Sequence, residues 1–256
     1  MTSRLAPNSL PGKAAPETLL LSARSLAMAP SSRFRVGCVA TGASGRRYLG
    51  FNLEFRRFGH TLHAEQVALL QAFEAGESGL SGMVIERAPC GHCRQFLLEG
   101  FSETTELSFP GYRGPLDPLL PFAFVGEEFT PDGVGVFSRN RFGPGAPDLE
   151  PSAADPAALA RWAARTSYAP YSGQLAAVAV VLSDGTPCVG RVVESAAYNP
   201  TVGPALSILA QLRAHQIPWR AIRSVFLSFD DGVMAWDEDT EQVMRDAGCP
   251  APIERV

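Results

Sequence analysis

Residues 63–73 read HAEQVALLQAF, and RAPCGHC follows at residues 87–93. The first stretch predicts a helix that starts at its histidine and ends before Gly76, because its apolar residues recur at helical spacing. The second stretch follows a short apolar segment, 83–87, which has the composition of a buried strand. A further helix is predicted over 95–99. The two stretches therefore predict a strand between two helices, with a histidine and two cysteines close to the helix starts.

The segments before residue 63 extend this alternation. A helix is predicted over 16–28, and strands are predicted over 34–38 and 47–53, with a turn at 42–45 between them. The order helix, strand, strand, helix, strand, helix is typical of an α/β/α sandwich, in which helices cover a mixed central sheet. We therefore predict an α/β fold.

An internal repeat becomes visible when the chain is compared with itself after a shift of 140 positions. The matches keep their order without a gap and fall largely on turn residues. They pair Ala29 with Ala169, Pro30 with Pro170, Ser32 with Ser172, Gly45 with Gly185, Gly50 with Gly190, Glu54 with Glu194, Leu69 with Leu209 and Gln71 with Gln211. Chance agreement among common residues is the alternative, and the preserved order argues against it. The chain is therefore predicted to hold two copies of one fold.

The second copy lacks the residues with metal-binding chemistry. Under the same shift the ligand candidates are all replaced, His63 by Gly203, Cys90 by Asp230 and Cys93 by Val233. We therefore expect one catalytic domain and one degenerate structural copy.

Composition suggests where the boundaries lie. Residues 141–156 are rich in proline and glycine, which predicts a linker, and residues 1–12 have the composition of an irregular arm. The predicted organisation is an N-terminal arm at 1–12, a catalytic domain at 13–140, the linker at 141–156 and a degenerate, non-catalytic domain at 157–256.

The charge and hydropathy of the chain argue against two classes of binding partner. The 256 residues carry 22 Lys and Arg against 26 Asp and Glu, and no long basic cluster, which argues against a nucleic-acid surface. The longest apolar run, 175–182, has eight residues, which fits a buried strand and falls far short of a membrane span. The N-terminus has no basic segment followed by an apolar stretch. We therefore expect a cytoplasmic protein with neither a nucleic-acid nor a membrane partner.

The cysteines point to a metal site. Five of them, an odd number scattered over the chain, argue against a disulfide framework. Cys90 and Cys93 are three residues apart, a spacing that in a reducing compartment indicates a metal site or a thiol redox pair. Catalytic zinc usually has three protein ligands and keeps a fourth position open. With His63 as the third ligand, the sequence predicts one zinc ion per chain.

Glu65 has the position of a proton shuttle. It follows His63 by two residues, about 200° around an ideal helix, so the two side chains are not expected to bind one ion head-on. A carboxylate beside the metal can instead take a proton from water and return it to a substrate. This favours a hydrolytic enzyme over a non-catalytic zinc-stabilised module, which has no use for such a carboxylate.

These residues carry a family resemblance. His63-Ala64-Glu65 followed by Pro89-Cys90-Gly91-His92-Cys93 resembles the H-x-E and P-C-x-x-C pair of the cytidine deaminase superfamily. The blocks FRVG at 34–37, NLE at 52–54 and HAEQ at 63–66 resemble those of deaminases that act on free nucleosides. ESAAYNPT at 194–201 resembles the degenerate C-terminal domain of the two-domain, homodimeric bacterial type. The N-terminus is shorter than the helical extension of that type.

The resemblance implies a role for each matching residue. It implies zinc binding by His63, Cys90 and Cys93 and general acid and base catalysis by Glu65. The implied substrate-binding set comprises Phe34 against the pyrimidine, Asn52 and Glu54 at the ribose hydroxyls, Leu53, Ala64, and a partner subunit's Ala197 and Tyr198. The implied reaction is hydrolytic deamination of cytidine and 2′-deoxycytidine in pyrimidine salvage, by a homodimer.

Other substrates remain open at the level of sequence. A deaminase of another small pyrimidine or nucleoside-like substrate would carry the same zinc motif. A nucleotide would require a basic phosphate cradle near the ribose site, and none is evident. A polynucleotide substrate would require interleaved basic and aromatic residues, which are sparse. Phe34 by itself also fits a core position at a strand start.

Overall fold

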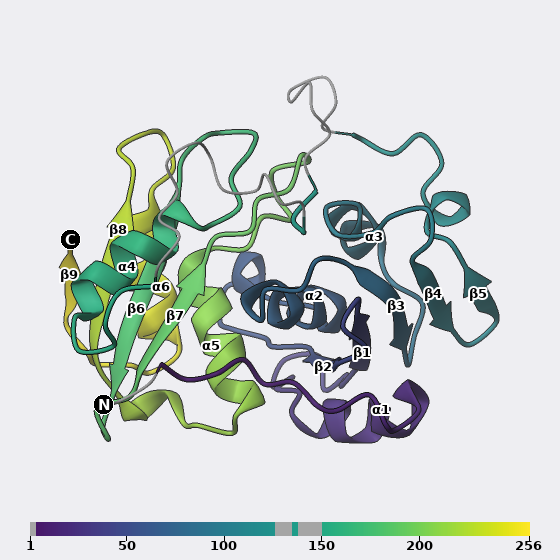
Figure 1. Ribbon diagram of the computed structural model, residues 1–256, viewed down its shortest axis with the longest axis horizontal. Coiled ribbons are helices and arrows are strands. Elements are labelled where there is room, and N and C mark those ends of the chain that lie inside the picture. Colours follow the sequence, from purple (N-terminus) through teal and green to yellow (C-terminus); the bar gives the residue numbers. More distant parts are fainter. Residues whose placement is uncertain (1–3, 126–134, 138–149) are drawn as a thin grey trace. The chain divides into compact units, whose positions relative to one another are not determined.

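The computed structural model describes residues 4–125, 135–137 and 150–256. Its chain divides into two compact units (Figure 1). The first unit comprises Pro7–Arg139 together with Ser195–Thr201, and the second comprises Met1–Ala6, Asn140–Glu194 and Val202–Val256. Each unit is an α/β structure built on a mixed sheet. The fold class predicted from the sequence is therefore confirmed.

The described sheet of the first unit has the strand order β2-β1-β3-β4-β5. Neighbouring strands are antiparallel except β3 and β4, which are parallel. The strands are β1 (Gly37–Gly42), β2 (Arg47–Phe51), β3 (Leu80–Ile85), β4 (Glu106–Phe109) and β5 (Tyr112–Gly114).

Helices cover both faces of this sheet, as Figure 1 shows. They are α1 (Pro16–Ser25), α2 (Ala64–Glu74) and α3 (Gly91–Leu97), with a short 3-10 turn at Phe58–His60 and another at Asp117–Leu119. Two glycines let the helices approach: a Cβ on Gly37 would lie 2.3 Å from a backbone oxygen of α1, and one on Gly50 would lie 2.0 Å from a backbone oxygen of α2. Gly50 pairs with Cys38, the residue that follows Gly37 in β1. Because successive residues of a strand point to opposite faces of the sheet, α1 and α2 lie on opposite faces. Every residue of α2 is buried.

The second unit repeats this plan with a sheet of order β7-β6-β8-β9 in the described residues. Its helix α4 packs against β6 and β7 on one face, and a Cβ on Gly190 in β7 would meet α5 on the other. The elements are α4 (Pro156–Arg165), β6 (Ala176–Leu182), β7 (Pro187–Arg191), α5 (Pro204–Ala214), a 3-10 turn (Trp219–Ala221), β8 (Ile222–Phe229), α6 (Trp236–Asp246) and β9 (Ile253–Arg255).

The structural repeat keeps the shift of 140 positions up to α5 and then departs from it. Helices α1 and α4, strands β2 and β7, and helices α2 and α5 have bounds that differ by 140. In β3, Met83 pairs with Ala40, whereas in β8 Val225 pairs with Val180, so the shift there is 142. The longer connection between α5 and β8 accommodates the two extra residues. Helix α3 starts at Gly91 and helix α6 starts at Trp236, 145 positions later. By position in the helix, the counterparts of Cys90 and Cys93 are therefore Ala235 and Glu238, rather than Asp230 and Val233.

One predicted strand begins later than expected. The sequence predicted a strand over 34–38, but β1 starts at Gly37. The Asn52 amide occupies the place of a strand partner, because its Oδ1 accepts from the Val36 amide at 2.9 Å and its Nδ2 donates to the Phe34 carbonyl at 2.9 Å. These bonds hold the segment before β1 clear of the sheet.

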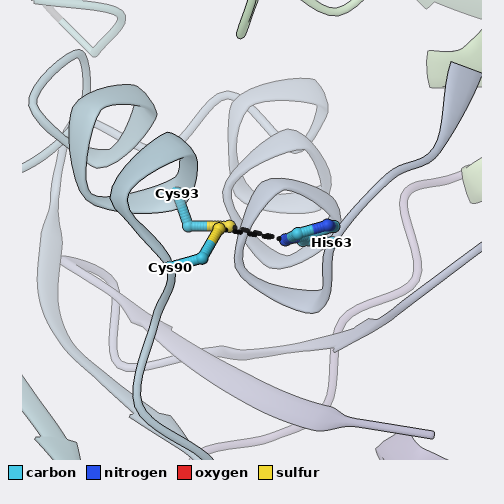
Figure 2. Close-up of side chains that lie close together, drawn as sticks. All are labelled: His63, Cys90 and Cys93. Carbon is cyan, nitrogen blue, oxygen red and sulfur yellow. Dashed lines mark hydrogen bonds between the residues drawn. The ribbon is translucent and has the colours of Figure 1, made fainter. Parts of the chain in front are cut away.

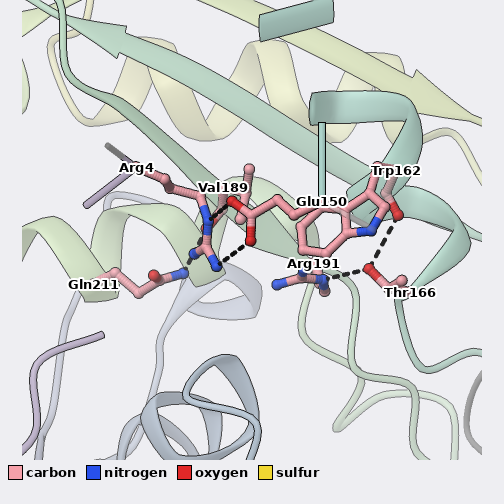
Figure 3. A network of polar contacts seen from close by, with 7 residues as sticks. All are labelled: Arg4, Glu150, Trp162, Thr166, Val189, Arg191 and Gln211. Atoms are coloured by element: carbon pink, nitrogen blue, oxygen red, sulfur yellow. Dashed lines mark hydrogen bonds and ion pairs between the residues drawn. The ribbon is translucent and has the colours of Figure 1, made fainter. Parts of the chain in front are cut away.

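The second unit also holds a polar network around a buried arginine, drawn in Figure 3. Arg191 donates from Nε to Thr166 Oγ1 at 2.9 Å, and its guanidinium carbon lies 4.7 Å from the centroid of the Trp162 ring. Arg4 reaches the same region and forms an ion pair with Glu150 at 2.6 Å.

The predicted linker, 141–156, lies outside the described residues up to position 149, and α4 begins at Pro156. Within the part of the chain that is described, the helices are too short or too polar to cross a membrane.

Candidate active site

Three side chains of the first unit converge into a group with metal-binding chemistry. The ligand atoms of His63, Cys90 and Cys93 all lie within 4.8 Å of one another. His63 Nδ1 lies 3.4 Å from Cys90 Sγ and 3.2 Å from Cys93 Sγ. Figure 2 shows both sulfurs directed from the start of α3 toward the same ring nitrogen of His63.

This group fits tetrahedral zinc. With Zn–S near 2.3 Å and Zn–N near 2.0–2.1 Å, a sulfur and a nitrogen on one tetrahedral zinc ion lie about 3.6 Å apart. The two observed sulfur–nitrogen distances are slightly shorter. A set of one imidazole and two thiols is a common zinc donor set, and three protein ligands leave one tetrahedral position for water.

Local structure explains how the sequence brings these ligands together. His63 is the N-cap residue of α2 and Cys90 is the N-cap residue of α3, each with an extended backbone. Gln66 closes a capping box with His63, because its Oε1 accepts from the His63 amide at 3.0 Å. The unpaired amides and the dipole at a helix N-terminus favour an anionic sulfur there.

The two sulfurs are poised to bind a cation. Hydrogen bonds from Cys93 and His63 lower the pKa of Cys90 to about 3. The hydrogen bond that Cys93 donates to Cys90, together with burial, raises the pKa of Cys93. The pair therefore retains one proton between the two sulfurs until a cation takes its place.

Glu65 lies beside the ligand group on the first turn of α2. Its residue is 5% exposed, and this burial raises the pKa of its carboxyl group. It lines a cavity of about 290 Å³, close to the lower end of the ~300–1,000 Å³ range for small-molecule sites. The cavity is lined by Ser32, Phe34, Val36, Asn52, Glu54, Thr61, His63, Ala64, Glu65, Arg87, Ala88 and Cys90.

Most of the substrate-binding residues predicted from the sequence line this cavity. Phe34 does so with 54% of its surface exposed, and Ala64 and Asn52 do so as buried residues. Leu53 does not, because it is fully buried and its backbone pairs with Met28 and Leu62.

Glu54 both lines the cavity and holds the segment that precedes β1. Its Oε2 accepts from the backbone amides of Ser31 at 2.9 Å and Ser32 at 3.0 Å, and Oε1 accepts from the Ser32 hydroxyl. Burial by itself would raise the pKa of Glu54, but these hydrogen bonds lower it. The carboxylate is therefore anionic at neutral pH and fixed in orientation.

Ala197 and Tyr198 do not line the described cavity. They belong to the segment Ser195–Thr201, which lies with the first unit although it comes from the second half of the sequence. Tyr198 has a left-handed backbone, with φ of 63°, and its residue is 65% exposed.

Sequence reasoning missed several residues of the cavity wall. Arg87 and Ala88 immediately precede the P-C-x-x-C motif, so their proximity to the ligands was a usable signal. Val36 lies in the FRVG block of the family resemblance, which was also a usable signal. Ser32 and Thr61 carried no such signal, because they reach the cavity through the packing of loops.

The corresponding place in the second unit is filled. Gly203 occupies the N-cap of α5, as His63 does in α2, and a Cβ on Gly203 would lie 2.9 Å from Asp239 Oδ2 and 3.5 Å from the Trp236 ring. Side chains of α6 therefore take the space beside Gly203 that a metal ligand at this position would need.

Comparison with known proteins places the chain in a family. A family model for the cytidine and deoxycytidylate deaminase zinc-binding region matches residues 14–105, and a second model of the same description matches 116–238. A cytidine deaminase of Aeromonas hydrophila is 35% identical over 237 residues, which cover 90% of this chain and 78% of that protein. The chain belongs to the cytidine deaminase family. Both halves carry the family fold, and the zinc-ligand set lies in the first.

Other members of the cytidine deaminase family give similar values. A cytidine deaminase of Aeromonas salmonicida is 40% identical over 192 residues, which cover 73% of this chain and 63% of that protein. One of Cronobacter sakazakii is 36% identical over 90% of this chain and 75% of its own length. A crystal structure of cytidine deaminase from Mycobacterium tuberculosis matches 43% of this chain and 98% of its own, with 31% identity and a TM-score of 0.40.

Proposed function

We propose that this chain catalyses the zinc-dependent hydrolytic deamination of cytidine and 2′-deoxycytidine, which yields uridine or 2′-deoxyuridine and ammonia. The observation that carries the proposal is the convergence of His63, Cys90 and Cys93 beside buried Glu65, at a cavity of about 290 Å³. Relatives at 35–40% identity that are named cytidine deaminase support the same reaction.

The residues divide the chemistry among them. His63, Cys90 and Cys93 would hold zinc, which when bound supplies Lewis acidity that lowers the pKa of water from about 16 to about 7. Glu65 accepts a proton from the attacking water and delivers it to N3 of the pyrimidine. The water oxygen forms a bond to C4, its second proton is passed by Glu65 to N4, and the C4–N4 bond breaks to release ammonia and leave the C4 carbonyl. The buried position of Glu65 keeps this transfer away from bulk solvent.

The cavity wall supplies the groups for substrate recognition. Asn52 and Glu54 offer an amide and a carboxylate to the ribose hydroxyls, and Phe34 offers a ring to the pyrimidine. Because both polar side chains are already fixed by hydrogen bonds to residues 31–36, they are preorganised for a sugar of one shape. A sugar that lacks a hydroxyl for either group would forgo one further hydrogen bond, worth about 0.5–1.5 kcal/mol of binding free energy.

One assay tests the proposal directly. The purified, zinc-loaded protein is incubated with cytidine, and uridine and ammonia are measured beside a Glu65→Gln variant. We expect equimolar products from the wild type and a kcat lower by about 10²–10⁴-fold in the variant. A zinc-loaded wild type that forms no uridine would contradict the proposal, and equal rates in both proteins would contradict the role of Glu65.

The assembly and the cellular role belong to the same proposal. The chain carries two family domains and one zinc-ligand set, so a homodimer would repeat a four-domain arrangement with two sites. In such a dimer Ala197 and Tyr198 would approach the partner's cavity, and the reaction would serve pyrimidine salvage in the cytoplasm. Light scattering of the zinc-loaded protein tests this, and a stable, active monomer would contradict the dimer.

A further inference from the structure

The segment Ser195–Thr201 contacts both elements that carry the proposed zinc ligands, although it comes from the degenerate half of the sequence. Gln66 in α2 donates from Nε2 to the Pro200 carbonyl at 3.2 Å. Glu99, which follows α3, accepts on Oε1 from the Ala196 amide at 2.9 Å. The two helices that bear the ligands are therefore tied to one short stretch of chain.

The contact at Pro200 determines how the Gln66 amide is oriented. Gln66 is 2% exposed, and its Oε1 accepts from the backbone amide of His63 at 3.0 Å. A carbonyl can accept but not donate, so Pro200 selects the orientation in which the NH₂ group faces it. The amide oxygen is then presented to His63. Reversal of the amide would break both hydrogen bonds, so Pro200 acts on the histidine through Gln66.

The same glutamine reaches the neighbouring ligand helix. Its Nε2 lies 3.3 Å from Nε2 of His92, which stands between the two cysteines in the sequence. His92 Nδ1 in turn lies 3.5 Å from Nδ2 of Asn199. The segment therefore contacts the first turn of α3 through His92. It also contacts the residue Glu99 that follows α3, which is buried with 4% of its surface exposed.

The segment is itself closed by internal hydrogen bonds. Ser195 donates its amide to Thr201 Oγ1 at 3.1 Å, so the two ends of the segment are joined. The Tyr198 amide donates to the Ser195 carbonyl at 2.8 Å, and the Thr201 amide donates to the Tyr198 carbonyl at 2.9 Å. A turn closed in this way presents the Pro200 carbonyl and the Ala196 amide at fixed positions.

We propose that the segment Ser195–Thr201 is a positioning element for the zinc site, and that Gln66 is the positioning residue through which it acts. The proposal rests on the zinc site of the proposed function and gives the degenerate half a part in it. The segment fixes the starts of α2 and α3 relative to each other. The imidazole and the two sulfurs are thereby held at the separation that one ion requires.

The test compares zinc affinity in two variants of one helix. Gln66→Met removes the amide contacts with His63, Pro200 and His92 at nearly constant volume. Gln71→Met is the matched control, because Gln71 is also fully buried in α2 and its amide atoms have no hydrogen-bond partner in the described structure. Zinc dissociation constants are measured by competition with a chromophoric chelator. We expect about 10-fold weaker binding for Gln66→Met, as for other residues that orient a metal ligand, and a change below about 2-fold for Gln71→Met.

A second variant tests the segment without touching the ligand helices. Thr201→Val keeps the side-chain shape and removes the acceptor of the Ser195 amide. We expect it to weaken zinc binding in the same direction as Gln66→Met and to lower kcat more than it raises KM. If Gln66→Met does not fold, this variant alone decides the question.

The outcomes separate positioning from general stability. If the substituted residue had a purely structural role, its substitution would lower the melting temperature equally with and without zinc. It would leave the zinc dissociation constant unchanged. That result in Gln66→Met, or in Thr201→Val where Gln66→Met fails to fold, would overturn the proposal, as would a wild type that binds no zinc. A wild type that binds zinc but does not deaminate cytidine would overturn the proposed function alone, because the affinity comparison does not depend on turnover.

Discussion

Glu54 and Glu194, 140 positions apart, accept hydrogen bonds from equivalent backbone amides in the two halves of the chain. Glu54 accepts from Ser31 and Ser32, and Glu194 accepts from Tyr171 and Ser172. The half without metal ligands has thus kept this carboxylate. The shared contacts are therefore structural, and any contact of Glu54 with a ribose comes in addition to them.

This pair separates the structural role of the carboxylate from substrate binding. We expect Glu194→Gln to lower the free energy of unfolding by about 1–2 kcal/mol, because two charge-assisted hydrogen bonds are weakened, and to leave KM for cytidine unchanged. Glu54→Gln should show a similar loss and raise KM at least about 10-fold, which corresponds to ~1.4 kcal/mol of binding. Denaturant unfolding and steady-state kinetics measure both. Equal KM values in the two variants would remove Glu54 from the substrate site.

Periodicity in the sequence predicted the helix of residues 64–74 and the strand of residues 47–51 well, because their apolar residues and flanking glycines act locally. The zinc-ligand set could also be predicted, because both ligand stretches lie at the starts of helices. The segment at residues 34–36 was predicted as a strand because its composition suits one. It is instead held by the side chain of Asn52, and composition does not encode such a bond.

Contacts between residues far apart in the chain could not be predicted from the sequence. Gln66 and Pro200 are 134 positions apart and share no repeat pattern. The two-residue displacement of β8 was missed because a shift without gaps cannot register a longer loop. Leu53 was grouped with its polar neighbours by the family motif, but strand alternation turns it into the core.

Acid should weaken one buried hydrogen-bond cluster of the first unit. Glu77 accepts from the Ser44 amide at 3.0 Å, from the Ser44 hydroxyl and from the Tyr48 hydroxyl at 2.6 Å. Burial would raise the pKa of Glu77, but these hydrogen bonds lower it. A carboxyl group with a lowered pKa in the folded state stabilises that state above its unfolded pKa of about 4.3, and the contribution is lost as pH falls further toward the folded pKa.

Glu77→Gln should therefore be less stable than the wild type at pH 7 by about 1–2 kcal/mol, with a difference that shrinks below about pH 4. Chemical unfolding at a series of pH values measures this difference. Glu103→Gln, at an exposed position, is the control and should follow the wild type throughout. A difference that stays constant from pH 7 to pH 3 would show that the ionised carboxylate contributes nothing.

Removal of zinc should abolish turnover reversibly. Dialysis against a strong chelator is expected to eliminate cytidine deamination, and one equivalent of zinc per chain should restore it, because His63, Cys90 and Cys93 are the one group of this kind in the described residues. Cys93→Ala should bind no zinc under the same conditions. Cys249→Ala removes a buried thiol of the second unit and should retain full metal content. Elemental analysis that finds two equivalents per chain, or full activity without zinc, would contradict this prediction.

Restoring the ligand types in the second unit should not restore a zinc site. By position at the helix starts, the counterparts of the three ligands are Gly203, Ala235 and Glu238, so the variant to make is Gly203→His with Ala235→Cys and Glu238→Cys. The new histidine would meet Asp239, whose Oδ2 lies 2.9 Å from the position of its Cβ. We expect zinc content to remain at one per chain in elemental analysis.

The single change Gly203→Ala isolates the steric part of this argument. A methyl group 2.9 Å from Asp239 Oδ2 forces that carboxylate, or α6 with it, to move, and we expect the free energy of unfolding to fall by about 1 kcal/mol. Gly79→Ala is the control, because a Cβ there meets nothing within 4 Å. If both variants are equally stable, α6 can move aside. The degenerate half would then have lost its metal through the ligands alone and not through the packing that replaced them.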